Sequence, residues 1–130
     1  IFNKKNKILM RKKIDNISID ENDTILNAMK KINLNQNREV LVVSKNKIKG
    51  ILSEGDILRA LLNEAQIVST IKAYYNKNFK YLLKLDYKKA EDLFIKFNFN
   101  IIPIVGKNFE LKNFITFKEL IKKKIKTKTK

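Results

Sequence analysis

Two short polar patterns in the sequence have the residue types and spacing to hold a negatively charged ligand. Ser53 is followed three residues later by Asp56, and Thr116 is followed three residues later by Glu119. At this spacing the hydroxyl and the carboxylate can close a capping box, in which each accepts a hydrogen bond from a backbone N–H of the other. The same hydroxyl, beside the free N–H groups of a helix start, can also bind a phosphate or ribose oxygen. Spacing alone leaves both interpretations open.

Neighbouring residues add groups that suit a nucleotide. A carboxylate at Asp56 can accept both hydrogen bonds from a ribose diol. Arg59 lies one helical turn further along and can reach a phosphate, and 63 positions later the corresponding residue is Lys122. Gly50 can let a ligand approach the backbone closely, or it can equally be a strand glycine that permits close packing.

The composition excludes several kinds of catalytic site. The chain has 130 residues with no histidine and no cysteine, so histidine-based triads, thiolate sites and most zinc sites are excluded. The acidic residues Asp20, Glu21 and Asp23 do not have metal-ligand spacing, and the three glycines do not form a phosphate-binding loop. We therefore predict no catalytic residue and no metal ligand in this segment.

The balance of 44% hydrophobic and 32% charged residues is typical of a soluble globular domain. No apolar run approaches the roughly 18 residues needed to span a membrane, and no signal-peptide pattern is visible. We expect a cytoplasmic protein without a membrane segment.

Positive charge is concentrated at the two ends of the chain. The net charge is +16, of which residues 1–13 carry +6 and residues 118–130 carry another +6. Such runs are usually solvated, and lysine, which dominates here, is poorer than arginine at reading bases. We therefore expect no nucleic-acid partner, and a polyanion binder that uses the basic ends remains the alternative.

Hydrophobic periodicity predicts a helix capped by Asp23, from residue 24 to about 33, and a helix capped by Ser53 that ends near 62. Between them, the valine-rich run 38–44 and the run 48–53 predict two strands. Ile67 and Ile71 have the spacing of one helix face, which predicts a connecting helix over residues 63–76.

The same order then recurs 62 or 63 residues later. Asp86 caps a predicted helix, strands follow over 100–105 and 109–116, and Thr116 caps the last helix. Short strands over 17–19 and 79–83 precede the two copies. An internal repeat of this length predicts an α/β fold in which two halves pack about a pseudo-twofold axis.

These motifs in this order resemble a tandem pair of cystathionine-β-synthase-type (CBS) domains, also called a Bateman module. The resemblance rests on DTILNAM and REVLVVSKNKIKGILSEGD in the first copy, and on NIIPIV and NFITFKE in the second. It divides the chain into a basic leader (1–13), a first repeat (14–63), a second repeat with the connecting helix (64–124) and a basic tail or linker (125–130). Each repeat is expected to run strand, helix, strand, strand, helix.

The resemblance implies a non-catalytic regulatory module that binds AMP, ADP, ATP or S-adenosylmethionine in clefts between the repeats. Each cleft in the family typically combines the Ser/Thr-x-x-Asp end of one repeat with two strands of the other. The first cleft is then expected to contain Gly50, Ser53, Asp56, Arg59, Phe79, Lys80, Tyr81, Ile102 and Pro103. The second is expected to contain Ile17, Ser18, Val40, Leu41, Thr116 and Glu119.

The second cleft departs from the family pattern. Asn113 stands where the motif has glycine, Glu119 replaces the aspartate, and Leu41 replaces the proline that Pro103 represents in the other repeat. The longer Glu119 side chain is expected to point its carboxylate outward. We therefore predict one nucleotide per chain, bound in the first cleft.

The resemblance also implies a homodimer and a larger parent protein. The sequence looks most like the CBS pair that precedes a sugar-phosphate nucleotidyltransferase domain, with the lysine-rich tail as the linker. A purely structural dimerisation module with degenerate clefts is the alternative.

Overall fold

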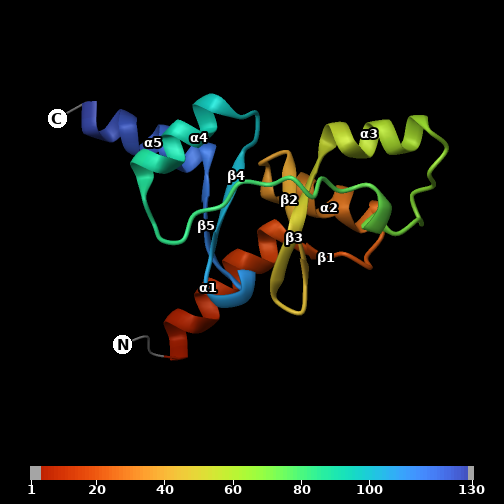
Figure 1. Ribbon diagram of the computed structural model, residues 1–130, viewed down its shortest axis with the longest axis horizontal. Coiled ribbons are helices and arrows are strands. Elements are labelled where there is room, and N and C mark those ends of the chain that lie inside the picture. Colours follow the sequence, from red (N-terminus) through yellow and green to blue (C-terminus); the bar gives the residue numbers. More distant parts are fainter. Residues whose placement is uncertain (1–3, 129–130) are drawn as a thin grey trace.

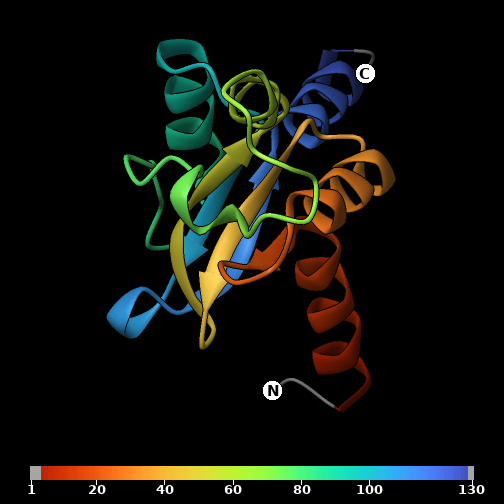
Figure 2. The ribbon, with the colours of Figure 1, turned by 90° about the vertical axis from the view of Figure 1, so that its right-hand side faces the viewer.

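Two small β-sheets face each other at the centre of the molecule, and helices cover their outer sides (Figures 1 and 2). The computed structural model describes residues 4–128. The first half consists of α1 (Lys4–Ile17), β1 (Ser18–Asp20), α2 (Ile25–Asn35), β2 (Glu39–Ser44), β3 (Lys47–Ser53) and α3 (Glu54–Leu62). The second half consists of the 3-10 turn η1 (Ile71–Ala73), α4 (Tyr87–Lys96), β4 (Ile101–Val105), the 3-10 turn η2 (Lys107–Phe109), β5 (Leu111–Thr116) and α5 (Phe117–Lys128).

The first sheet has the strand order β1-β2-β3, in which β1 pairs with β2 in parallel and β2 pairs with β3 antiparallel. The second sheet contains the antiparallel pair β4-β5. Leu82 adds a single parallel bridge to Ile104 on the free side of β4. The two sheets are therefore built alike, although the first strand of the second one is reduced to one residue pair.

Side chains point alternately to the two faces of each strand, and this divides the buried residues into three hydrophobic clusters. Val40 and Val42 point toward α2 and α3, whereas Leu41 between them points toward the opposite sheet. In β4, Ile102 and Ile104 pack under α4 and α5, and Ile101 joins Leu41 in the cluster between the sheets. Because a strand buried on both faces needs apolar residues throughout, the runs VLVV and IIPIV are uniformly hydrophobic.

The two halves repeat each other in detail. The N–H of Glu54 donates to Arg38, and 62 or 63 residues later the N–H of Phe117 donates to Asn100. Each sheet has a hairpin turn with left-handed residues, at 45–46 in the first half and 108–109 in the second. The predicted order of helix, strand, strand and helix in each half is confirmed, including the apolar strands and the helices that follow Ser53, Asp86 and Thr116.

The predicted connecting helix over 63–76 is wrong. Only Ile71–Ala73 forms a single 3-10 turn, and the rest of the segment is irregular. Several of its backbone groups bond to other elements: Ser69 accepts from the N–H of Ile25, and Asn76 exchanges two hydrogen bonds with Ile51. The β-branched residues Val68, Thr70 and Ile71 lower the helix propensity here, so tertiary hydrogen bonds decide the conformation.

Two smaller expectations also change. The predicted strand over 79–83 is wrong except at Leu82, because Phe79 and Tyr81 lie outside the ladder, where their rings contact Phe109. The N-cap of α2, predicted at Asp23, lies one residue later. Thr24 is the N-cap, since its hydroxyl accepts from the N–H of Asn27.

Helix α1 extends across the boundary that the sequence analysis placed at residue 13. Its last turns pack Ile14 and Ile17 into the cluster between the sheets, and it contacts both α2 and β5. Its lysine and arginine side chains are exposed. Within residues 4–128, none of the helices combines the length and the apolar character needed to cross a membrane.

The close packing at Gly50 predicts a clear difference between two glycines. A Cβ on Gly50 would lie 2.3 Å from the carbonyl oxygen of Asn76 and 2.4 Å from the ring of Tyr75. A Cβ on Gly55 would meet the flexible end of Arg59 at 3.4 Å and the Ser53 hydroxyl at 3.7 Å, which are ordinary contact distances. We expect Gly50→Ala to lower the free energy of unfolding by about 1–3 kcal/mol.

Chemical denaturation measures the free energy of unfolding of both variants, and Gly55→Ala is the matched control. Because Gly55 lies in helix α3, alanine should leave stability unchanged or raise it by up to about 1 kcal/mol. Equal losses at both positions would contradict the packing described here.

Candidate ligand-binding clefts

The start of helix α3 carries a complete capping box. The Ser53 hydroxyl accepts from the N–H of Asp56 at 3.1 Å, and Asp56 Oδ2 accepts from the N–H of Ser53 at 2.9 Å. The other oxygen, Oδ1, accepts from Arg59 Nη2 at 2.7 Å. The Arg59 side chain is 69% exposed, so this ion pair is weak, and an incoming hydroxyl can replace it at Oδ1.

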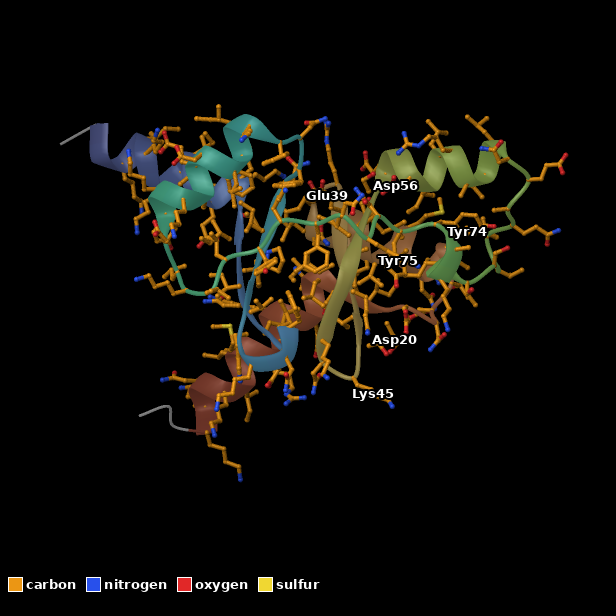
Figure 3. All side chains as sticks on the ribbon, viewed as in Figure 1. Asp20, Glu39, Lys45, Asp56, Tyr74 and Tyr75 are labelled. Atoms are coloured by element: carbon orange, nitrogen blue, oxygen red, sulfur yellow. The ribbon has the colours of Figure 1, made fainter. Side chains whose placement is uncertain are left out.

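A cavity of about 430 Å³ opens beside this helix start. Its wall combines α3 with the loop before β4, so both halves contribute to it, and Figure 3 shows Asp56 and Glu39 next to each other at this end of the sheets. The lining residues are Arg38, Glu39, Ile51, Ser53, Glu54, Gly55, Asp56, Arg59, Asn76, Asn98, Phe99 and Asn100. We call this cavity the α3 cleft.

Glu39 was not identified by the sequence analysis, and it lies at the base of the α3 cleft. Its Oε1 accepts from the backbone N–H of Asn100 at 2.8 Å and from that of Ile101 at 3.1 Å. The residue is 4% exposed. A glutamate at the start of a strand that is otherwise buried and apolar was the available signal, because such a charge needs a partner.

Burial raises the pKa of the Glu39 carboxyl from 4.5 to about 7. The two backbone N–H donors lower this pKa, and the negative charge of Asp56 raises it further. Since the desolvation effect is the largest, Glu39 changes its protonation state close to neutral pH.

The remaining residues predicted for the first cleft lie outside this cavity. Gly50 is buried beneath Tyr75 and Asn76, where the close-packing interpretation applies. Ile102 and Pro103 are buried in β4. The other three lie on the connecting segment: Phe79 and Tyr81 contact each other, and the Lys80 ammonium lies 4.6 Å from the ring centre of Phe97. Ser53, Asp56 and Arg59 are the predicted residues that line the α3 cleft.

The second helix start resembles the first more closely than the sequence suggested. The Thr116 hydroxyl accepts from the N–H of Glu119 at 3.1 Å, and Glu119 Oε1 accepts from the N–H of Thr116 at 3.3 Å. The extra methylene therefore does not turn the Glu119 carboxylate away from the cap. The other residues predicted for the second cleft do not join this helix start: they are buried and line neither of the two cavities beside it, which are described next. These residues are Ile17, Ser18, Val40 and Leu41.

Two cavities adjoin the start of α5. One, of about 480 Å³, lies between the end of α2 and Lys118. The other, of about 1040 Å³, is lined by Asn35, Gln36, Asn37, Tyr87, Thr116, Lys118, Glu119, Lys122, Lys123, Ile125 and Lys126. We call the larger one the lysine cavity.

The α3 cleft and the lysine cavity differ in charge. Three carboxyl groups and two guanidinium groups line the α3 cleft, whereas four ammonium groups and one carboxylate line the lysine cavity. Among residues 4–128, no histidine, cysteine, aspartate and glutamate side chains are grouped so that they could hold a metal ion.

A family model described as the CBS domain matches residues 7–63. No curated protein matches the sequence. Solved structures share the fold over most of the chain. A CBS domain pair/ACT domain protein from Thermotoga maritima matches with a TM-score of 0.70 and 16% identity, over 85% of this chain and 88% of that one.

Two further solved structures agree. A putative acetoin utilization protein from Vibrio cholerae matches with a TM-score of 0.76 and 19% identity, over 86% of this chain and 84% of the other. A CBS domain protein from Pyrobaculum aerophilum, complexed with AMP, matches with a TM-score of 0.68 and 20% identity, over 79% and 81% of the two chains. At these identities the likeness concerns the fold, which is that of a CBS domain pair.

The raised pKa of Glu39 predicts a pH-dependent stability. Between pH 4.5 and about 7 the folded protein keeps a proton on Glu39 that the unfolded chain has lost. The stabilisation is therefore fully present below pH 4.5 and is lost as the pH rises through about 7. We expect this group to lower the free energy of unfolding by about 3 kcal/mol across the window.

Glu39→Gln should remove that pH dependence, because an amide does not titrate in this range. The contact itself should be kept, since the amide oxygen can still accept from both N–H groups. Urea denaturation of the two proteins at several pH values measures it, with Glu54→Gln, an exposed change in the same cleft, as the control. A constant difference in stability between Glu39→Gln and the unchanged protein at all pH values would contradict the assignment.

Proposed function

We propose that this chain, which has the fold of a CBS domain pair, is a non-catalytic regulatory module that binds an adenine nucleotide in the α3 cleft. The observation that carries the proposal is the Asp56 carboxylate. One of its oxygens is fixed by the cap, and the other faces an exposed guanidinium that a ligand can displace. A fixed acceptor at the mouth of a cleft is the group needed to bind a ribose diol.

In the proposed complex the ribose hydroxyls donate to Asp56 Oδ1, and Arg59 turns outward to a phosphate. The exchange is favourable because an exposed ion pair contributes about 0–1 kcal/mol, whereas a hydrogen bond to a charged group contributes about 1.5–3 kcal/mol. The Ser53 hydroxyl can add a contact to the ligand while it still accepts from Asp56.

The charge of the α3 cleft favours a ligand with few phosphates. Glu54 and Asp56 are balanced by Arg38 and Arg59, and Glu39, whose pKa is about 7, adds negative charge as the pH rises through neutrality, so the cleft has no excess of positive charge. A triphosphate would bring more negative charge into this setting than a monophosphate does. We therefore favour AMP over ADP and ATP, and S-adenosylmethionine, which is cationic, also fits this balance. The similar protein from Pyrobaculum aerophilum is complexed with AMP.

We propose one nucleotide per chain. The lysine cavity has a complete cap of its own, but its acceptor is the longer Glu119, whose bond to the cap is 3.3 Å. Asn113 also replaces the motif glycine there. The lysine cavity is the alternative place for a polyphosphate, and the experiment below separates the two sites.

The wider context is part of the same proposal. We infer a cytoplasmic homodimer in which ligand binding regulates a covalently linked domain. The expectation of a sugar-phosphate nucleotidyltransferase as that domain stays a prediction, since the solved structures described above are of other proteins. A structural dimerisation module with empty clefts would not respond to any nucleotide.

Asp56→Ala should weaken AMP binding about tenfold or more, because it removes a charged acceptor. Glu119→Ala is the matched control at the equivalent cap and should leave the affinity nearly unchanged. Titration calorimetry gives both affinities together with the stoichiometry, and ATP measured in the same way should bind more weakly than AMP. Two AMP sites per chain, or the larger loss in Glu119→Ala, would contradict the proposal.

A further inference from the structure

One oxygen of the buried Glu39 carboxyl is left for a ligand. Oε1 accepts from the backbone N–H groups of Asn100 and Ile101, at 2.8 and 3.1 Å. Within residues 4–128 no hydrogen bond joins Oε2 to another residue, yet no fully buried side-chain nitrogen or oxygen lacks a partner there. Oε2 therefore reaches open space, and because Glu39 lines the α3 cleft while it is 4% exposed, that space is the cleft.

Strand pairing places this carboxyl beside the capping box of α3. Glu39 in β2 faces Ser53 in β3 across the antiparallel ladder. Side chains of facing residues point to the same side of a sheet, with Cβ atoms about 4.5–5.5 Å apart. Figure 3 shows the side chains of Glu39 and Asp56 next to each other. A nucleotide held by Ser53 and Asp56 therefore comes within reach of Glu39 Oε2.

Within residues 4–128, no cation forms an ion pair with Glu39. Arg59 is paired with Asp56, and the Lys118 ammonium donates to the carbonyl of Gln36. The charged side chains that line the cavities around the carboxyl are Arg38 next to it, Glu54, Asp56 and Arg59 on α3, and Lys118 on α5. A buried carboxyl beside another carboxylate and without a paired cation is more stable in its neutral form.

The titration of Glu39 agrees with this geometry. Burial has the largest effect on the pKa of its carboxyl, which is raised to about 7, and the charge of Asp56 raises it further. The side-chain amide of Asn100 lowers this pKa but has the smallest of the effects, so it does not take the place of a partner for Oε2.

The neutral carboxyl supplies a donor that the ionised one lacks. Oε1 already faces two N–H donors, so the proton belongs on Oε2, which then donates a hydrogen bond into the cleft. A nucleotide offers mostly acceptors, namely phosphate oxygens, ribose oxygens and ring nitrogens. It also brings negative charge, which an ionised carboxylate at the base of the cleft would repel.

We infer that Glu39 is a ligand-binding residue of the α3 cleft, which is protonated in the complex and whose Oε2–H donates a hydrogen bond to an acceptor atom of the nucleotide. The inference rests on the proposed function, because it needs the nucleotide in this cleft. The proton comes from solvent, so protonation and nucleotide binding favour each other. Acidification near neutral pH therefore acts on the module in the same direction as more nucleotide does.

Glu39→Gln tests the inference with AMP as the probe. The amide oxygen still accepts from both N–H groups, and the amide N–H replaces Oε2–H as the donor, so the variant mimics the protonated residue. Between about pH 6 and about pH 8.5, the dissociation constant of the unchanged chain should rise at least about fivefold more than that of the variant, because only the protonated fraction binds well. Titration calorimetry measures both constants.

The sign of the effect separates this role from a merely structural one. At the higher pH Glu39→Gln should bind AMP more tightly than the unchanged chain does. The phosphate of AMP also titrates, with a pKa of about 6, but it affects both chains alike. Glu54→Gln, which removes an exposed carboxylate from the same cleft, is the matched control and should change the affinity by nearly the same factor at both pH values.

A second measurement needs no variant. Calorimetry of the unchanged chain at about pH 7.5, in two buffers of different ionisation enthalpy, should show that AMP binding takes up protons, up to about one per site. Absence of this uptake, or the same pH dependence in the unchanged chain and in Glu39→Gln, would overturn the inference and leave the nucleotide site in place.

Two other results are equally clear. Weaker binding of AMP by Glu39→Gln at both pH values would also overturn the inference, since Glu39 would then act only by holding the two halves together. Absence of AMP binding to both chains at both pH values would contradict the proposed function itself, and the inference with it.

Discussion

One buried carboxylate joins the two halves of this molecule. Glu39 belongs to the first sheet, yet its side chain accepts from the two N–H groups at the start of β4 in the second sheet. Those N–H groups have no strand partner at that end, so the glutamate supplies the acceptor that they need. The start of β4 and the loop before it are thereby held against β2. The α3 cleft exists because this contact sets the distance between its two walls.

The same contact explains why the clefts differ in spite of the repeat. The position that corresponds to Glu39 in the second half is Ile101, which is apolar and packs between the sheets. A carboxylate therefore lies at the base of one cleft and not of the other, and the lysines of α5 increase the contrast. Both helix starts carry the same pair of cap hydrogen bonds, so the two clefts differ mainly in the charge of the side chains around the cap.

Features encoded by local patterns could be predicted from the sequence. The apolar runs predicted the positions of the strands, and the short polar patterns predicted the caps at Ser53 and Thr116. Features decided by distant partners could not. The segment 66–71 has helical spacing of its isoleucines, but its hydrogen bonds go to α2, some 40 residues earlier in the chain. The role of Glu39 depends on Asn100, which lies 61 residues away. Gly50 is required by Tyr75 and Asn76, a contact that no pattern around the glycine shows.

The central claim is that the α3 cleft is the nucleotide site, and a titration of the ¹⁵N-labelled chain with AMP tests it most directly. The account predicts saturable shifts of the backbone amides of Ser53, Asp56 and Asn100, which come from both walls of the cleft and from the cap. The amides of Thr116 and Glu119 should remain in place. Shifts at Thr116 and Glu119 instead, or no saturable shift anywhere, would contradict it.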